Sequence, residues 1–202
     1  EELDDEHQVE FLQERSDEQA AALLSRMASD DAADLLLELD QDRRLPVLNL
    51  MPADDQRKIR AILGHNPSTA GGLMDPDFVS VPTDATVEEA LEQVRSSELS
   101  PEQASIICVV DGRSVFVGAV PLARLILAEP GERMADLIDE RTPAVMAETD
   151  LPEVATLMSD WNLIALPVLD GEGRPEGLIS VDDILELLLP EDWRRRAAGA
   201  RS

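Results

Sequence analysis

The feature of this sequence that most constrains its fold is a helical pattern that repeats every twelve residues between Gln8 and Leu63. Apolar residues within each repeat have the i, i+3, i+4, i+7 spacing of one helix face. Helices of about ten residues are too short to be stable alone and must stack on their neighbours. The segment therefore predicts an array of short packed helices. The apolar positions are Phe11 and Leu12, then Ala20, Leu23, Leu24 and Met27, then Ala32, Leu35, Leu36 and Leu39, then Val47, Leu48 and Met51, and last Ile59 and Leu63.

Each predicted helix begins at a capping sequence. Ser16 with Gln19 is typical of a capping box, and later helices are expected to open at Ser29-Asp30, at Asp40 and at Pro52-Ala53-Asp54. The array should end at Gly64-His65-Asn66-Pro67, because glycine, asparagine and proline stop a helix and redirect the chain. A domain boundary is expected there.

The rest of the chain contains an α/β unit twice. In each copy a Thr-Asp pair, Thr83-Asp84 or Thr149-Asp150, precedes an amphipathic helix and then an apolar strand. The strands, 106–110 and 165–169, end in Asp-Gly, which predicts a hairpin turn and a next strand that starts near Gly118 or Gly177.

The two copies differ in length between the helix and the strand. Asp84 and Asp150 are 66 positions apart, whereas Asp111 and Asp170 are 59 apart. About seven additional residues, around Ser97 to Gln103, are therefore expected in the first copy.

Composition limits the possible functions. With 43 acidic and 17 basic residues the formal net charge is −26, which repels phosphate backbones, so nucleic acid is excluded as a partner.

The single cysteine, Cys108, is expected to be buried in a strand and fits a reducing, cytoplasmic compartment. No nucleophile–base pair, phosphate loop or metal–histidine cluster indicates an enzyme, and His7 and His65 are expected to be exposed. No apolar stretch approaches the length of a membrane span, and the first residue is not methionine, which suggests a fragment.

Specific motifs resemble a known family. Leu166-Pro167-Val168 and the segment 177–183 resemble the second member of a tandem CBS pair. The sequence Ala70-Gly71-Gly72-Leu73-Met74 resembles the junction ahead of the CBS pair in MgtE-type magnesium transporters, and the segment 29–34 is similar to their helical N domain. The resemblance implies an α plus α/β fold, in which a superhelical domain of short helices is followed by two β-α-β-β-α units. The expected domains are an N domain at 1–69, a linker with the first CBS domain at 70–137, the second CBS domain at 138–189, and a basic tail at 190–202.

The resemblance also implies a magnesium site between the N domain and the CBS pair. Asp30 and Asp34 lie one helical turn apart, where like charges repel unless a cation bridges them. The implied set of ligands is Asp30, Asp34, the backbone at Gly72, Asp150, Asp183, Glu186 and Glu191. Oxygen ligands suit Mg²⁺. Alternatively, Asp30 and Asp183 each cap a helix and the others are merely solvated.

A second implied site would take ATP, ADP or AMP. Gly177, Ser180 and Asp183 preserve the CBS motif in which a hydroxyl and a carboxylate hold the ribose. The first copy has Pro121 and Arg124 at the equivalent places, so one nucleotide site per chain is expected. Trp161 either stacks on an adenine or, more commonly for such a residue, packs in a core.

The function that the resemblance implies is a cytosolic Mg²⁺-sensing region of a magnesium transporter, linked to a membrane transport domain. The alternative is a free-standing soluble regulator that responds to an adenine nucleotide or acts through a protein partner. Two departures from the family argue against a direct link to a pore. Asn162 stands where the family often carries an acidic ligand, and the chain turns basic at Arg194-Arg195-Arg196, where the family continues with acidic residues. These arginines either contact anionic lipid or form a solvated tail. A homodimer through the CBS pair is expected because two apolar helix faces, Leu122, Leu125, Ile126 and Leu185, Leu188, Leu189, need a cover.

Overall fold

The computed structural model describes residue 9 and residues 11–97, 99–138 and 141–188. The chain divides into two compact units. One comprises residues 65–184, and the other comprises the chain up to Gly64 together with the residues from Leu185 onward.

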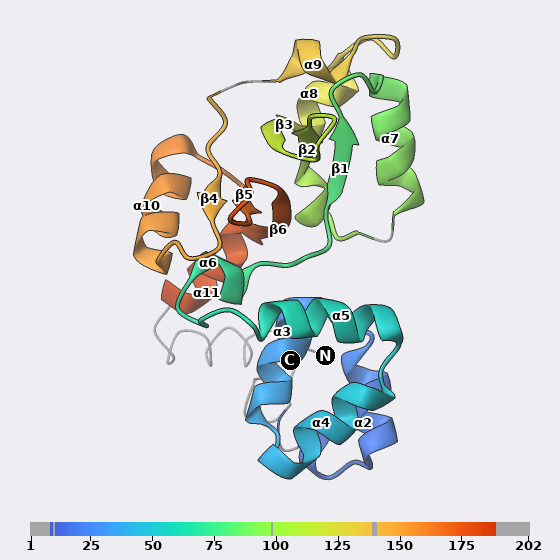
Figure 1. Ribbon diagram of the computed structural model, residues 1–202, viewed down its shortest axis with the longest axis vertical. Helices are drawn as coiled ribbons and strands as arrows, with labels where there is room; N and C mark the ends of the chain where they lie inside the picture. Colours follow the sequence, from blue (N-terminus) through green and yellow to red (C-terminus); the bar gives the residue numbers. More distant parts are fainter. Residues whose placement is uncertain (1–8, 10, 98, 139–140, 189–202) are drawn as a thin grey trace, which may run out of the picture. The chain divides into compact units, whose positions relative to one another are not determined.

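Among the described residues, the N-terminal part contains the short helices α2 Asp17–Leu24, α3 Ser29–Glu38, α4 Gln41–Leu50 and α5 Ala53–Ile62 (Figure 1). Helix α2 packs on α4, and α3 packs on α5. The leucines that occupy equivalent positions of the repeat, Leu24, Leu36 and Leu48, are all at most 3% exposed. The predicted array of stacked helices is therefore confirmed, with the apolar face of each repeat in a shared core.

The helices begin close to the predicted residues, but not every predicted capping residue is the N-cap in the structure. Ser16 and Gln19 form the predicted capping box, with Gln19 N donating to Ser16 Oγ at 3.4 Å and Ser16 N donating to Gln19 Oε1 at 3.3 Å. Helix α3 begins at Ser29 as predicted, but its N-cap is Ala28, so Asp30 lies within the first turn. The interpretation of Asp30 as a cap is therefore wrong.

Residues 65–184 contain two small three-stranded sheets. The first has the order β1 Val79–Pro82, β2 Ile106–Val110, β3 Phe116–Pro121, and the second has β4 Val145–Met146, β5 Ala165–Leu169, β6 Pro175–Ser180. In both sheets the central strand is parallel to the first and antiparallel to the third. The identical topology confirms the predicted duplication and the tandem β-α-β-β-α arrangement.

The helices of the two copies also correspond. Helices α7 Val87–Ser96 and α8 Leu122–Leu127 belong to the first copy, and α10 Leu151–Trp161 and α11 Val181–Leu188 to the second. The short helix α6 Ala70–Leu73 precedes the first copy, and the short helix α9 Met134–Leu137 lies between the two copies. A 3₁₀ helix, η1, spans Gln103–Ser105. A cluster that includes Cys108, Ala119, Ala165 and Leu178 contains residues of both sheets, so the two copies share a core.

The hairpins are longer than a two-residue Asp-Gly turn. Asp111 Oδ1 accepts hydrogen bonds from the backbone N–H groups of Arg113 and Val115, at 2.8 and 2.9 Å. Asp170 repeats this arrangement in the second copy. The carboxylate organises a loop that is wider than a two-residue turn. The next strands begin at Phe116 and Pro175, slightly before the predicted starts near Gly118 and Gly177.

The structure corrects three predictions about exposure. Leu125 is completely buried in the core of the first copy, so it is not part of an exposed apolar face, whereas Ile126 is 65% exposed. Trp161 is 49% exposed and does not pack in a core. The His65 side chain is partly buried, with its Nε2 3.5 Å from Glu176 Oε1. Leu185 and Leu188 are exposed as predicted, and Leu189 lies outside the described residues.

None of the helices in the described part of the chain combines the length and the apolar character needed to cross a membrane.

Candidate functional site

The predicted nucleotide motif lies where strand β6 ends and helix α11 begins. Ser180 N donates to Asp183 Oδ2 at 3.0 Å, and Asp183 N lies 3.4 Å from Ser180 Oγ. The Ser180 hydroxyl also donates to Asp183 Oδ2. The two side chains that would hold a ribose therefore bond each other in a capping arrangement, which supports the structural alternative for Asp183. A ligand at this position must exchange its own hydroxyls for those contacts.

A buried carboxylate that the sequence analysis missed lies close to this motif. Asp75 is 7% exposed, and its backbone N–H and C=O both bond to Leu178, each at 2.8 Å. Its Oδ1 accepts from Asp77 N at 2.9 Å, and its Oδ2 accepts from Gln103 Nε2. Asp75 thus connects three segments: the entry to β1, the additional residues of the first copy, and strand β6. The Asp75-Pro76-Asp77 sequence was the available signal, since aspartates before a strand favour such turns.

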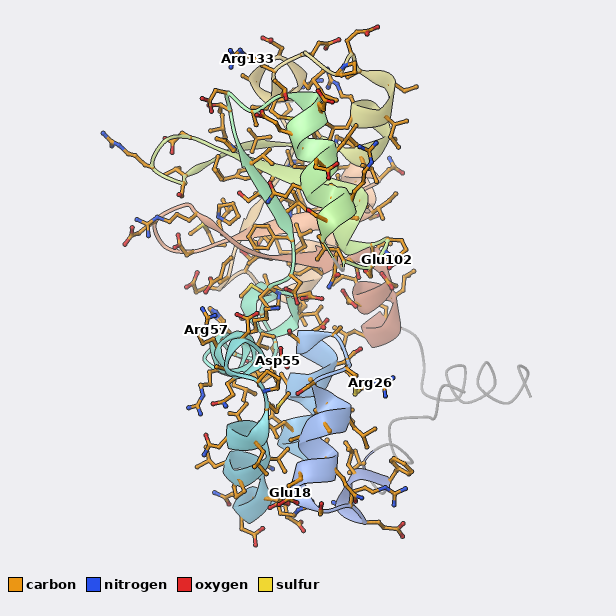
Figure 2. All side chains as sticks on the ribbon, turned by 90° about the vertical axis from the view of Figure 1, so that its right-hand side faces the viewer. Glu18, Arg26, Asp55, Arg57, Glu102 and Arg133 are labelled. Carbon is orange, nitrogen blue, oxygen red and sulfur yellow. The ribbon has the colours of Figure 1, made fainter. Side chains whose placement is uncertain are left out.

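The electrostatic environment of the motif is acidic. Burial raises the pKa of Asp75. The hydrogen bonds from Asp77 and Gln103 oppose this rise, and the nearby Asp183 carboxylate adds to it. Burial also raises the pKa of Asp183, against its bonds from Ser180, and the charges of Asp182 and Glu102 add to the rise. Glu102 lies beside the first turn of α11 (Figure 2). Three acidic side chains, those of Asp75, Asp182 and Glu102, therefore lie near Asp183.

Gly177 has a packing role that accounts for its place in the motif. A Cβ at this position would lie 2.7 Å from the Asp75 carbonyl oxygen and 2.8 Å from Met74 Cγ. Only a glycine lets the segment at Met74–Asp75 approach strand β6 this closely. Its assignment as a nucleotide-binding residue remains a prediction.

The equivalent place in the first copy has different chemistry. Strand β3 ends at Pro121 and α8 begins at Leu122, so the backbone arrangement matches that of β6 and α11. Pro121 has no hydroxyl, and Arg124 is an exposed base in place of the aspartate. The pair that would hold a ribose is absent at these two positions.

The predicted magnesium ligands are distributed over both units. Asp30 and Asp34 lie on α3, where Asp30 is partly buried and Asp34 exposed. Gly72 and Asp150 belong to adjoining segments, because Thr69 pairs with Asp150 and Ala70 N donates to Thr149 O at 2.8 Å. The Glu186 side chain and Glu191 lie outside the described residues.

The donor chemistry of these residues suits a hard cation, since carboxylate and carbonyl oxygens are the ligands that Mg²⁺ takes in proteins. Within the described ranges, however, no three side chains of His, Cys, Asp or Glu are gathered as a metal cluster. The ligand set therefore remains a prediction.

Comparisons with known proteins identify both parts of the chain. Residues 1–68 match the family model of the MgtE intracellular N domain, and residues 70–131 and 134–190 match that of the CBS domain. The chain is 36% identical over 165 residues to the magnesium transporter MgtE of Thermus thermophilus, covering 80% of this chain and 37% of that protein. It is 28% identical over 203 residues to the magnesium transporter MgtE of Bacillus subtilis, covering 99% and 45%. The chain thus spans less than half the length of these curated relatives.

Two solved structures are similar over most of the chain. The crystal structure of the soluble part of a magnesium transporter has a TM-score of 0.84 and 30% identity, covering 93% of this chain and 73% of that one. The crystal structure of the cytosolic domain of the Mg²⁺ channel MgtE in complex with ATP has a TM-score of 0.70 and 29% identity, covering 92% and 86%.

Proposed function

Because the chain belongs to the family in which an MgtE intracellular N domain precedes CBS domains, we propose that it is the Mg²⁺-sensing regulatory region of a magnesium transporter. The observation that carries the proposal is this combination of domains, with similarity to magnesium transporters over nearly the whole chain. In this role the region faces the cytosol, and its output partner is a membrane transport domain.

The proposed mechanism depends on the carboxylates that the two units carry. At a net charge of −26 a state that brings acidic surfaces together is destabilised by repulsion. Mg²⁺ bound between Asp30 and Asp34 of one unit and Asp150 and Asp183 of the other would offset that repulsion and favour a closed state. The resulting stabilisation grows as RT ln(1 + [Mg²⁺]/Kd), about 1.4 kcal/mol at ten times Kd.

The test separates specific binding from screening. Melting temperature and scattering radius are measured in millimolar MgCl₂ and in NaCl of equal ionic strength. The melting temperature of the unmodified protein should rise more in MgCl₂ than in NaCl, and its scattering radius should fall more. The double variant Asp30→Asn, Asp34→Asn should lose most of this additional response to MgCl₂. A matched control, Glu38→Gln with Asp42→Asn, removes two charges from exposed positions nearby and should keep it. Equal responses of all three proteins to the two salts would overturn the proposal.

The proposed region acts as a homodimer. Apolar side chains at the end of α8 are exposed, Ile126 at 65% and Leu127 at 88%, and a second copy would cover them. Light scattering should give twice the chain mass at tens of micromolar, and a monomer at that concentration would contradict the dimer.

A second candidate function is adenine nucleotide binding at Ser180 and Asp183. It is favoured by the likeness to an MgtE cytosolic domain solved with ATP and by the position of the two side chains at the start of α11. Calorimetry should give one site per chain, because Pro121 and Arg124 replace the pair in the first copy. Two equivalent sites per chain would contradict this assignment.

A further inference from the structure

Strand β6, which ends at the Ser180–Asp183 motif, is held differently along its two edges. On one edge it pairs with β5 over its whole length, from Pro175 to Ser180. On the other edge, among the described residues, the bridge to Asp75 is isolated: each backbone N–H of Asp75 and Leu178 donates to the carbonyl of the other at 2.8 Å. Two backbone hydrogen bonds offset little more than the entropy of fixing the residues that make them. The bridge therefore depends on what holds Asp75 in place.

The side chain of Asp75 is anchored by two donors. Its Oδ1 accepts from Asp77 N at 2.9 Å, and its Oδ2 accepts from Gln103 Nε2. Gln103 is itself held by Ser100, because Gln103 Oε1 accepts from Ser100 N at 2.7 Å and Gln103 N donates to Ser100 Oγ at 3.2 Å. The Gln103 amide is thus fixed at both ends, with its donor end on a carboxylate that is 7% exposed.

This anchor comes from the additional residues of the first copy. Residues 97–105 separate α7 from β2, whereas residues 162–164 separate α10 from β5 in the second copy. Through Asp75, the additional residues secure a strand of the other copy. Two positions beyond Leu178 that strand reaches Ser180, whose N–H and hydroxyl both donate to Asp183 Oδ2.

We propose that Gln103 and Asp75 are positioning residues for the nucleotide site, whose contact holds the end of β6 in the geometry that receives a ribose. The inference rests on the proposed nucleotide site. Without the Gln103 donor, the buried Asp75 carboxylate loses a hydrogen bond, and its segment should move toward water and release β6. A nucleotide must then restore the geometry of Ser180 and Asp183 as it binds, which lowers its affinity.

The first experiment measures the dissociation constants of AMP and ATP by calorimetry on the full chain, in EDTA and at constant ionic strength. Gln103→Leu removes the donor without a change of charge and with little change of size. We expect both dissociation constants to rise by about tenfold and by the same factor, because AMP and ATP share the ribose. A loss confined to one of the two nucleotides would overturn the positioning role.

Exchange of the two partners tests whether the contact itself is responsible. Asp75→Asn places two donors opposite each other, and Gln103→Glu places two carboxylates opposite each other, so each single variant should weaken both nucleotides. In the double variant Asp75→Asn, Gln103→Glu, the new amide can donate to the new carboxylate, which still accepts from Ser100 N. The double variant should recover most of the affinity, and losses that simply add would contradict the proposal.

Gln93→Leu is the matched control. Gln93 is an exposed glutamine of the first copy, and its Nε2 donates to Ser80 O at 3.3 Å, on β1 rather than on the segment that pairs with β6. It should leave both dissociation constants unchanged. Urea unfolding checks that each variant is folded.

The outcomes separate this inference from the site on which it rests. Unchanged binding by Gln103→Leu would overturn the positioning role and leave the nucleotide site intact. Failure of the unmodified protein to bind AMP and ATP at millimolar concentration would instead refute the nucleotide site, and the positioning role with it.

Discussion

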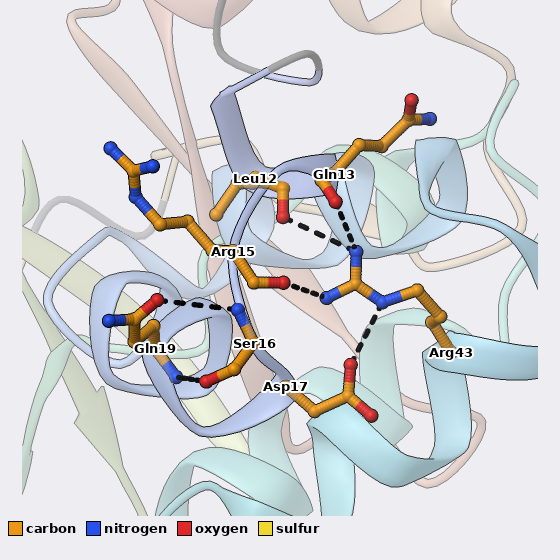
Figure 3. A network of polar contacts seen from close by, with 7 residues as sticks. All are labelled: Leu12, Gln13, Arg15, Ser16, Asp17, Gln19 and Arg43. Atoms are coloured by element: carbon orange, nitrogen blue, oxygen red, sulfur yellow. Dashed lines mark hydrogen bonds and ion pairs between the residues drawn. The ribbon is translucent and has the colours of Figure 1, made fainter.

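The guanidinium of Arg43, on helix α4, donates from Nε to Oδ1 of Asp17 at 2.8 Å, at the start of α2 (Figure 3). The same guanidinium donates to the backbone carbonyls of Gln13 at 3.0 Å and Arg15 at 2.7 Å. The contact joins residues 26 positions apart, and the Arg43 side chain is 18% exposed. One side chain therefore fixes the chain that enters α2 against the helix on which α2 packs.

Replacement of Arg43 should destabilise the N-terminal helices. Arg43→Ala removes several charge-assisted hydrogen bonds from a partly buried position, so we expect the free energy of unfolding to fall by about 2 to 3 kcal/mol. Arg57→Ala is the control, because the Arg57 pair with Asp54 is exposed at both ends and should contribute less than about 1 kcal/mol. Urea unfolding measures both changes, and equal losses would show that the Arg43 network adds no more stability than the exposed Arg57–Asp54 pair.

The two glycines at Gly177 and Gly171 should respond differently to the same substitution. Gly177→Ala places a methyl group 2.7 Å from a backbone oxygen of Asp75, so we expect a loss of about 1 to 3 kcal/mol from forced separation of the segments. Gly171→Ala meets no heavy atom within 4 Å and should change stability by less than about 0.5 kcal/mol. Thermal unfolding of both variants tests this, and a neutral Gly177→Ala would refute the close-packing role.

Two aspartates should give opposite dependences of stability on pH. The folded-state pKa of Asp75 is raised, mainly by burial, so its ionisation opposes folding above that pKa. As the pH falls through this raised pKa toward the ordinary value of about 3.9, the unmodified protein should gain stability relative to Asp75→Asn. Backbone hydrogen bonds from Val115 and Arg113 lower the pKa of Asp111, so its contribution exists above about pH 3.9 and disappears as the pH falls through the lowered value.

Unfolding free energies of the protein, Asp75→Asn and Asp111→Asn, measured from neutral pH to about pH 4, compare these signs. On acidification, the free energy of unfolding of the unmodified protein should increase relative to that of Asp75→Asn. For Asp111 the difference should stay level over this range, because its contribution is lost only below about pH 3.9. The same slope for both variants would contradict the environment assigned to Asp75.

The single cysteine should report unfolding. Burial raises the pKa of the Cys108 thiol to about 12, and the side chain is fully buried in strand β2. We therefore expect Cys108 to resist a thiol-specific reagent at pH 8 in the native protein and to react completely in urea. A Gly112→Cys variant adds an exposed thiol on the neighbouring turn as a positive control. Rapid native labelling of Cys108 would show that the shared core of the two sheets opens readily.

Much of the fold follows from local patterns. The repeat at Leu24, Leu36 and Leu48 predicts stacked helices because the spacing of apolar side chains decides which face of a short helix must be buried. The two copies of the α/β unit are likewise visible, since equivalent strands and turns recur in order. The Ser16 capping box and the burial of Cys108 follow from residue type and immediate neighbours.

The tertiary structure alone decided what surrounds the candidate site. Asp75 pairs with Leu178, and Gln103 reaches Asp75, although more than 100 and 28 positions respectively separate these partners in the sequence. Leu125 is buried and Trp161 exposed for the same reason: each belongs to an amphipathic helix, and only the packing of that helix decides which of its apolar positions meets a core. Periodicity identifies the apolar face of a helix. Which segment covers that face depends on contacts between parts of the chain that are distant in the sequence. Local sequence therefore determined the elements and their order, and long-range packing determined the acidic surroundings of Ser180 and Asp183.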